Sequence, residues 1–250
     1  MIEIRSIASW IVIVMLIAVF FPLVAIGFCF DFKGRYAHRV IRGWGRVVMR
    51  LLRAKVHVVG GEEIDPNKPY VIVSNHESNV DVMILLVHLP VDFKFASKRS
   101  LFFVPLMGWA MVLAGYIFIK RGQGAERAKM VVNDMVSKIK QGFSVLLFPE
   151  GTRSIDGKMR PFKKGAFHLA ADTGADILPC AVVGSREALG KGEWRIRESR
   201  VLLMIGKPMA IKGESPSENG IESLVQSGFD QVFALRQRGQ EIFSEKVLTK

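Results

Sequence analysis

Residues 70–88 read YVIVSNHESNVDVMILLVH, and this stretch decides the fold. Its first part, Tyr70–Ser74, is short, apolar and rich in β-branched side chains, which predicts a buried strand. A polar turn follows, and Val80–His88 then predicts a helix. A buried strand that passes directly into a helix is typical of α/β proteins with a mostly parallel sheet.

The same alternation of short apolar runs and helical patterns continues along the chain. Further strands are predicted at Val56–Val59, Phe93–Ala96, Tyr116–Ile119, Ser144–Phe148, Ile177–Val183 and Arg200–Ile205. Further helices are predicted at Leu101–Val112, Ala125–Lys140, Lys164–Asp172 and Ile221–Arg238. We therefore expect an α/β domain over residues 56–250, with a mostly parallel sheet flanked by helices. Functional groups in such a sheet lie beyond the carboxyl ends of the strands.

The composition narrows the class of protein and its partner. The chain has 250 residues, of which 50% are hydrophobic, and this excludes a disordered protein. Its 35 Lys and Arg exceed its 23 Asp and Glu, and the resulting net charge of +12 indicates a polyanionic partner. The high hydrophobicity favours an anionic membrane surface. We expect no nucleic-acid partner, because no recognised binding motif accompanies the cations.

The N-terminal region contains the longest uncharged run. Ile7–Phe30 (IASWIVIVMLIAVFFPLVAIGFCF) has 24 residues without a charge, which as a helix would be about 36 Å long, enough to cross a hydrocarbon layer of about 30 Å. The run is too long for a cleaved signal peptide, and no small-residue cleavage site follows it. Pro22 interrupts it, so both one kinked helix and a helix that turns back within the membrane interface are possible.

A basic stretch follows the apolar run. Its cations are Lys33, Arg35, Arg39, Arg42, Arg46, Arg50, Arg53 and Lys55, opposed only by Asp31. Because cations stay on the cytoplasmic side, we expect the rest of the chain on the cytoplasmic side of the cell inner membrane. The five arginines from Arg39 to Arg53 fall within about 80° of one helix face. Residues 1–55 are therefore predicted to anchor the chain on an anionic leaflet, although a surface helix packed on the domain would show the same pattern.

A second uncharged run, Ser100–Ile119, also has the length of a membrane span. Pro105, Gly108 and Gly115 interrupt it, and its last residues fit a buried strand better. A second span would also return the following residues to the far side of the membrane. We therefore predict that this run belongs to the soluble domain.

The turn after Tyr70–Ser74 carries residues suited to general-base catalysis. Asp81 follows His76 by five residues and could hold one ring nitrogen, which would leave the other as a base. The chain has no G-x-S-x-G motif for a nucleophilic serine, which indicates that the nucleophile is a hydroxyl of the substrate. The alternative is that Asp81 or Asn79 only caps the helix and that His76 is incidental.

A second turn follows the predicted strand Ser144–Phe148. Its sequence, Pro149-Glu150-Gly151-Thr152-Arg153-Ser154, supplies a glycine, two hydroxyls and a guanidinium, a set suited to an oxyanion or a phosphate. An ordinary reverse turn with a solvated arginine remains the alternative. Cations that follow in the sequence favour a phosphate-bearing ligand, and these are Lys158, Arg160, Lys163 and Lys164.

Taken together, these motifs resemble a known family. The blocks are Asn75-His76-x4-Asp81, Lys98-x2-Leu101-x3-Pro105-x2-Gly108, Gly115-x2-Phe118-Ile119-Lys120-Arg121, Phe148-Pro149-Glu150-Gly151-Thr152-Arg153-Ser154 and Leu178-Pro179. In this order and with these gaps they resemble the glycerolipid acyltransferases, specifically the 1-acyl-sn-glycerol-3-phosphate (lysophosphatidic acid) acyltransferases. The resemblance covers about residues 71–183. Lys120 stands where that family often has an acidic residue.

The resemblance implies a reaction and a set of site residues. His76, oriented by Asp81, would deprotonate the sn-2 hydroxyl of the lysophospholipid, which attacks the thioester of acyl-CoA or acyl-carrier protein and gives phosphatidic acid. No metal and no bound organic cofactor is implied. The substrate-binding residues would be Lys98, Lys120, Arg121, Glu150, Gly151, Thr152 and Arg153. The run Ser100–Ile119 could then line a channel for the acyl chain.

Two other functions fit parts of the pattern. Within the same family, the acceptor could be another lyso-lipid, such as a lyso-ornithine lipid or a lysophospholipid with a larger head group. From a different class, the chain could be a membrane protein that binds phospholipid without turning it over. Such a protein would have no use for a His–Asp pair, so the sequence favours the enzyme.

Overall fold

The computed structural model describes residues 2–119, 125–211 and 217–248. Its centre is a seven-stranded sheet in the order β1-β7-β6-β2-β5-β3-β4. The strands are β1 (Ala54–Gly60), β2 (Tyr70–Ser74), β3 (Phe93–Lys98), β4 (Ile117–Ile119), β5 (Ser144–Leu147), β6 (Asp176–Val183) and β7 (Ser199–Ile205). Each corresponds to a strand predicted from the sequence, with ends that differ by up to two residues. Only the pairing of β6 with β7 is antiparallel, which confirms the mostly parallel sheet.

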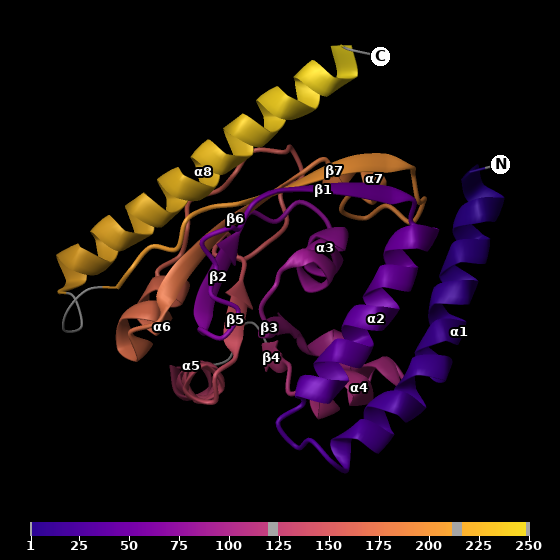
Figure 1. The fold of residues 1–250 in the computed structure, drawn as a ribbon, viewed down its shortest axis with the longest axis horizontal. Coiled ribbons are helices and arrows are strands. Elements are labelled where there is room, and N and C mark those ends of the chain that lie inside the picture. Colours follow the sequence, from indigo (N-terminus) through magenta and orange to yellow (C-terminus); the bar gives the residue numbers. More distant parts are fainter. Residues whose placement is uncertain (1, 120–124, 212–216, 249–250) are drawn as a thin grey trace.

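Helices cover both faces of the sheet. They are α1 (Ile2–Phe28), α2 (Arg35–Leu51), α3 (Val80–His88), α4 (Met107–Leu113), α5 (Ala125–Lys140), α6 (Gly165–Thr173), α7 (Ser185–Ala188) and α8 (Glu218–Leu248), with a 3₁₀ helix η1 (Arg99–Phe103). In Figure 1, α1 to α4 lie on one side of the sheet, and α5, α6 and α8 lie on the other. The predicted α/β class is therefore confirmed.

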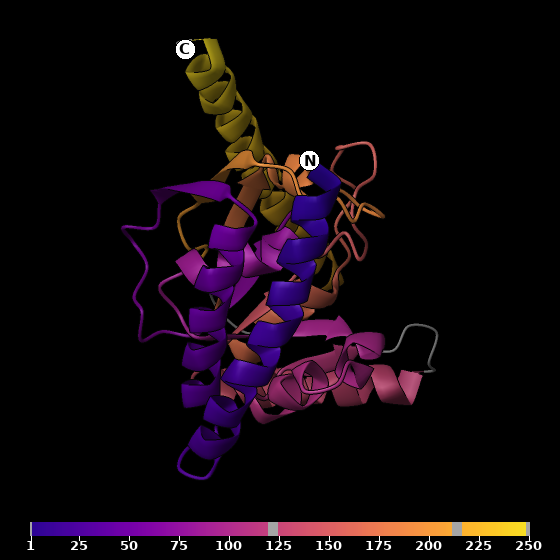
Figure 2. The ribbon, with the colours of Figure 1, turned by 90° about the vertical axis from the view of Figure 1, so that its right-hand side faces the viewer.

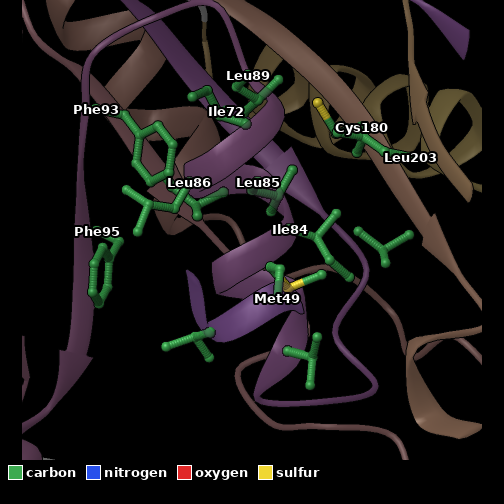
Figure 3. Close-up of a cluster of buried hydrophobic side chains, with 14 of the residues drawn as sticks. Met49, Ile72, Ile84, Leu85, Leu86, Leu89, Phe93, Phe95, Cys180 and Leu203 are labelled. Carbon is green, nitrogen blue, oxygen red and sulfur yellow. The ribbon is translucent and has the colours of Figure 1, made fainter. Parts of the chain in front are cut away.

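The alternation of side chains along the strands divides the core in two. Ile72 of β2 packs with the leucines of α3, whereas its neighbours Val71 and Val73 pack with α6 on the opposite face. Figure 3 shows the first of these clusters, in which Ile84, Leu85 and Leu86 fill the space between α3 and the sheet. All three are fully buried. Because both faces of the central strands are covered, those strands are apolar throughout.

Helix α1 is continuous through Pro22 and does not turn back. It packs against α2 and α4, and Figure 2 shows it lying beside α2 along its length. Among the described residues it is the one helix long and apolar enough to cross a membrane, and only 17% of its most apolar window is buried. Its apolar side chains exposed by more than half are Ile4, Ile7, Ile11, Val14, Met15, Val19 and Ile26.

Two sequence predictions for the helices near α1 need correction. The predicted helix Leu101–Val112 is broken, because Pro105 cannot donate the helical hydrogen bond and holds Val104 in an extended conformation. Gly108 permits the resulting close approach, since a Cβ there would lie 1.9 Å from the carbonyl oxygen of Phe102. As predicted, the run Ser100–Ile119 forms no membrane span.

The basic face predicted for α2 is also shorter than expected. Arg53 lies beyond the end of the helix, with a φ of 51°. Arg42 points to the domain and donates to the carbonyl oxygen of Val91 at 2.8 Å. Arg39, Arg46 and Arg50 remain exposed. Helix α2 thus packs on the domain through one side and presents a narrower set of cations than its sequence indicates.

A buried lysine joins these helices to the sheet. The Lys94 ammonium on β3 donates to the carbonyl oxygens of Gly34 at 3.0 Å and Ala114 at 2.7 Å, and it lies 4.0 Å from the centroid of the Phe143 ring. Burial lowers the pKa of Lys94 to about 7. A neutral amine still has two N–H groups, enough for both carbonyls. The contact fixes the connection between α1 and α2 against the domain.

Candidate active site

Two turns meet at the carboxyl edge of the sheet. We call residues 75–81, after β2, the His76 turn, and residues 148–154, after β5, the Arg153 turn. Strands β2 and β5 pair in parallel, with Val73 opposite Leu147, so both turns leave the same edge. The backbone N–H of Ser154 donates to the carbonyl oxygen of His76 at 2.8 Å, which joins the two turns directly.

His76 and Asp81 form a hydrogen-bonded pair. The distance between His76 Nδ1 and Asp81 Oδ2 is 2.9 Å, and Asp81 is fully buried. A carboxylate only accepts, so Nδ1 carries the proton and, in the neutral ring, Nε2 has a free lone pair. None of the described residues forms a hydrogen bond with Nε2. The geometry is that of an imidazole poised as a base.

Asp81 also fixes the backbone of the turn. Its Oδ2 accepts the N–H groups of Glu77 and Ser78 at 2.8 Å each, in addition to the imidazole. The other oxygen, Oδ1, is buried and has no hydrogen-bond partner among the described residues. Helix capping was the alternative explanation for Asp81, but the two N–H groups that its carboxylate accepts belong to residues before α3, so it holds the turn and the imidazole and not the helix N-terminus. The Asn79 side chain makes no capping hydrogen bond.

An aromatic ring covers one face of the imidazole. Phe148 stacks on His76 with ring centroids 3.9 Å apart and an interplanar angle of 16°. The ring is therefore held both in its plane, by Asp81, and across its face, by Phe148. The His76 side chain is still 17% exposed to solvent. Phe148 was not among the predicted site residues, although its position at the end of a buried strand and directly before the Arg153 turn is a usable signal.

Glu150 is a buried residue of the Arg153 turn that also contacts the His76 turn. It is 4% exposed, and its Oε1 and Oε2 accept the backbone N–H groups of His76 at 2.8 Å and Arg160 at 3.0 Å. Burial raises the pKa of Glu150, and the two N–H donors oppose that rise. Both carboxylate oxygens are thus engaged by the backbone.

Two contacts over long sequence separations hold the His76 turn. The Asn75 amide pairs with the backbone of Val182 on β6, donating at 2.9 Å and accepting at 2.8 Å. Arg236 of α8 donates to Glu77 at 3.0 Å and to the carbonyl oxygen of Gly157. Burial raises the pKa of Glu77, and the Arg236 guanidinium opposes that rise. Sequence analysis included Asn75 in the first block of the resemblance without giving it a role, and no local pattern marks Arg236.

The Arg153 turn is more open. Gly151 has a φ of +71°, and a Cβ there would lie 3.0 Å from the Lys163 ammonium nitrogen. Thr152 and Arg153 are partly exposed. In the part of the chain that the structure describes, the Arg153 guanidinium has no acidic partner. The turn therefore presents positive charge that no carboxylate of the described residues neutralises.

The remaining predicted site residues lie beyond β3 and β4. Lys98 is the exposed last residue of β3, next to β5 in the sheet, and so stands at the same edge as the two turns. Lys120 and Arg121 lie outside the described residues. The structure thus brings His76, Asp81, Glu150, Gly151, Thr152 and Arg153 together and places Lys98 along the same edge. The roles assigned to them stay predictions.

Two other features bear on what the site could bind. Within residues 2–119, 125–211 and 217–248, no group of three His, Cys, Asp or Glu side chains could hold a metal ion.

A hollow of about 670 Å³ lies between α2, β1 and the end of α3, lined in part by Arg46, Arg50, Arg53 and Lys55. It includes none of the residues of the two turns, so the hollow and the His–Asp pair are separate features.

Comparisons with known proteins agree with the resemblance seen in the sequence. A 1-acyl-sn-glycerol-3-phosphate acyltransferase of Chlamydomonas reinhardtii is 39% identical over 159 residues, which are 62% of this chain and 47% of that protein. The human 1-acyl-sn-glycerol-3-phosphate acyltransferase alpha is 33% identical over 164 residues, 66% of this chain and 58% of that protein. The chain thus spans about half the length of the curated relatives it matches.

A solved structure has the same architecture. The crystal structure of the 1-acyl-sn-glycerophosphate (LPA) acyltransferase PlsC from Thermotoga maritima matches with a TM-score of 0.77 and 26% identity, over 94% of this chain and 96% of that one. The sequence model of the Acyltransferase family matches residues 55–183, which is more than half of the chain and includes both turns. The chain therefore belongs to the Acyltransferase family.

Proposed function

We propose that this protein is a membrane-bound 1-acyl-sn-glycerol-3-phosphate acyltransferase. It transfers a fatty acyl group from acyl-CoA or acyl-carrier protein to the sn-2 hydroxyl of lysophosphatidic acid and forms phosphatidic acid. The observation that carries the proposal is the 2.9 Å bond between His76 Nδ1 and Asp81 Oδ2, beside a turn whose guanidinium pairs with no carboxylate of the described residues. The names of the relatives in plants, mammals and yeast support this choice of acceptor.

The mechanism needs one base and no enzyme nucleophile. His76 Nε2 removes the proton of the acceptor hydroxyl as its oxygen attacks the thioester carbonyl. The imidazolium that forms is stabilised by Asp81, which is already hydrogen-bonded to its other nitrogen. The tetrahedral intermediate then expels the thiolate, which takes the proton from His76. Ester and free thiol leave, and the imidazole returns to its neutral form.

The acceptor phosphate lies at the Arg153 turn. The Arg153 guanidinium can form a forked pair of hydrogen bonds with a phosphate, and Thr152 adds a hydroxyl. Lys98, Lys120 and Arg121 contribute further positive charge, as the family resemblance implies. Glu150, a residue of the Arg153 turn, holds the His76 turn through the His76 N–H and the segment after its own turn through the Arg160 N–H.

No metal and no organic cofactor is assigned in this proposal. A thioester is already an activated acyl donor, so the reaction needs only a base for the acceptor hydroxyl and a site that aligns the two substrates. Acyl-CoA or acyl-carrier protein takes part as co-substrate.

The N-terminal region attaches the enzyme to its substrate's membrane. Residues 1–55 form the anchor and residues 56–250 the acyltransferase domain. The exposed apolar face of α1 is continued by Phe103, Trp109 and Val112 near α4, each at least 59% exposed. Arg39, Arg46 and Arg50 attract an anionic leaflet. We place the enzyme on the cytoplasmic side of the inner membrane, where lysophosphatidic acid is a component of the leaflet it contacts.

The test is an acceptor and donor survey with the full chain in detergent or vesicles. Labelled acyl-CoA and acyl-carrier protein are each offered with lysophosphatidic acid and with other lyso-lipids. We expect turnover of lysophosphatidic acid, and a loss of at least about 100-fold in kcat for His76→Ala. The control His57→Ala removes an exposed imidazole on the edge strand β1 and should keep full activity. Turnover of another lyso-lipid without lysophosphatidic acid would contradict the acceptor, and an active His76→Ala would contradict the base.

A further inference from the structure

One segment of the chain bridges α1 and the two turns. After α7, residues 189–196 run past the N-terminal part of α1, where the Trp10 indole donates to the carbonyl oxygen of Trp194 at 2.8 Å. Arg195 pairs with Glu3 at 2.6 Å. The Ile196 N–H donates to the Ser6 hydroxyl at 2.9 Å, and its carbonyl oxygen accepts from Arg5 at 2.9 Å. Residues 194–196, at the C-terminal end of the segment, are thus held by the first turns of α1.

The same segment contacts both turns at its other end. The Ser78 hydroxyl of the His76 turn donates to the carbonyl oxygen of Leu189 at 2.6 Å. Two residues later, the Lys191 ammonium lies 3.5 Å from the Thr152 hydroxyl and 3.3 Å from the Arg153 carbonyl oxygen. The segment therefore presents a lysine at the Arg153 turn, although Lys191 lies 38 residues from Arg153 in the sequence.

We propose that Lys191 is a phosphate-binding residue of the acceptor site, an inference that rests on the proposed function. Its ammonium has three N–H donors, and its two contacts are long and go to neutral oxygens. No carboxylate in the described part of the chain pairs with it. The solvated Lys191 ammonium lies beside the Arg153 turn, whose guanidinium has no acidic partner among the described residues. A phosphate dianion bound at this turn could therefore contact both cations.

The charges around the turn favour a phosphate monoester. Lys163 approaches Gly151 from one side and Lys191 approaches Thr152 and Arg153 from another. The nearest acidic side chain in sequence, Glu150, is turned inward with both oxygens occupied by backbone N–H groups. Positive charge at this turn is therefore not neutralised by the turn itself. A monoester with a charge close to −2 at neutral pH is the ligand that gains most from it.

The position relative to His76 indicates which phosphate this is. The Ser154 to His76 backbone bond of 2.8 Å keeps the Arg153 turn next to the base. In lysophosphatidic acid the reacting hydroxyl and the phosphate ester are on adjacent carbons, so the base and the phosphate-binding groups must be close together. In acyl-CoA the whole pantetheine arm separates the thioester from the nucleotide phosphates. The geometry therefore fits the phosphate of the acceptor.

The experiment compares Lys191→Ala and Lys191→Arg with the wild type and with the control Lys140→Ala. Lys140 is an exposed lysine at the end of α5, so its removal changes the net charge equally. KM and kcat are measured for lysophosphatidic acid and for acyl-CoA, together with the inhibition constant of sn-glycerol 3-phosphate. For Lys191→Ala we expect the KM for lysophosphatidic acid and that inhibition constant to rise about fivefold, the scale of one partly solvated charged hydrogen bond.

The other parameters separate binding from structure. We expect kcat, the KM for acyl-CoA and the thermal unfolding midpoint to stay at wild-type values, and Lys191→Arg to restore most of the affinity. An unchanged KM for lysophosphatidic acid overturns the inference, as does a rise in the KM for acyl-CoA instead. Equal loss of kcat and thermal stability in both variants would show a structural role and overturn it too. If the wild type itself does not acylate lysophosphatidic acid, the proposed function fails first.

Discussion

The His76 turn and the Arg153 turn leave neighbouring strands, yet they are built in opposite ways. In the His76 turn the polar groups are buried and held: Asp81 accepts three donors through one oxygen, and Asn75 pairs with Val182 on β6. In the Arg153 turn Glu150 is buried, but the Arg153 guanidinium is partly exposed, and neither it nor the exposed Lys191 beside the turn has an acidic partner in the described part of the chain.

The difference between the two turns fits the roles that we propose for them. A general base works only if its lone pair points at one hydroxyl, so its ring is held by buried hydrogen bonds and by stacking on Phe148. A phosphate-binding cation gains most if no carboxylate already neutralises it. Glu150 belongs to the Arg153 turn but is buried, and its carboxylate accepts the backbone N–H groups of His76 and Arg160, so it holds the backbone in place and leaves the neighbouring cations unpaired.

The strongest test of the comparison removes the charge that orients the base. In Asp81→Asn the side chain keeps its shape but no longer stabilises the imidazolium. We expect kcat to fall at least about 100-fold, with the KM for lysophosphatidic acid nearly unchanged. Steady-state kinetics on purified enzyme measure both. Asp134→Asn, a partly exposed carboxylate on α5, is the matched control. A rise in KM without loss of kcat would mean that Asp81 serves binding and that the comparison is wrong.

A smaller effect is expected at the Arg153 turn. Arg153→Ala removes the guanidinium but no buried contact, so we expect the KM for lysophosphatidic acid to rise at least about tenfold. The kcat at saturating acceptor and the thermal unfolding midpoint should change little. Arg200→Ala, an exposed arginine on β7, serves as control. If kcat falls instead while KM is unchanged, the guanidinium acts on the reaction and not on the acceptor phosphate.

The smallest effect on catalysis, and a large one on stability, is expected for Arg236→Met. Glu77 and Arg236 are 8% and 12% exposed, so the change leaves a buried carboxylate without its cation. The free energy of unfolding should fall by about 3 kcal/mol at pH 8, and kcat by a few fold as the His76 turn loosens. Urea denaturation and kinetics measure the two. Arg238→Met, exposed on the same helix, is the control.

The pH dependence of this variant has a defined sign. Burial raises the pKa of Glu77 in the folded protein above its value in the unfolded chain, and the loss of Arg236 raises it further. The penalty is therefore present at high pH and is lost as pH falls through the folded pKa, because a protonated Glu77 needs no partner. The stability deficit should shrink between pH 8 and pH 5. A deficit that is constant with pH would show that packing, and not charge, is lost.

Much of the fold could be predicted because its signals are local. The apolar runs at Tyr70–Ser74 and Ile177–Val183 are short and bounded by turn residues, and both form strands of the sheet. Helix α8 was predicted too short, because the largely polar residues 236–241 interrupt the apolar pattern before Ile242 and Phe243, which pack against the same core. The prediction of one helix across Pro105 was wrong. The apolar pattern continues through Pro105, but a proline inside a helix cannot donate the backbone hydrogen bond, so the helix is interrupted there.

The candidate site also has a part that local sequence predicts and a part that it does not. The sequence by itself determined the His76–Asp81 pair, which we predict to be catalytic, and the cationic turn, because His76 and Asp81 are five residues apart and residues 149–154 are contiguous. Only the tertiary structure decided what surrounds them: Val182, Lys191 and Arg236 reach the turns across 38 to 159 residues of chain. Such contacts depend on the order of the strands and the placement of the helices. Neither produces a periodic pattern of residues that could be recognised in the sequence.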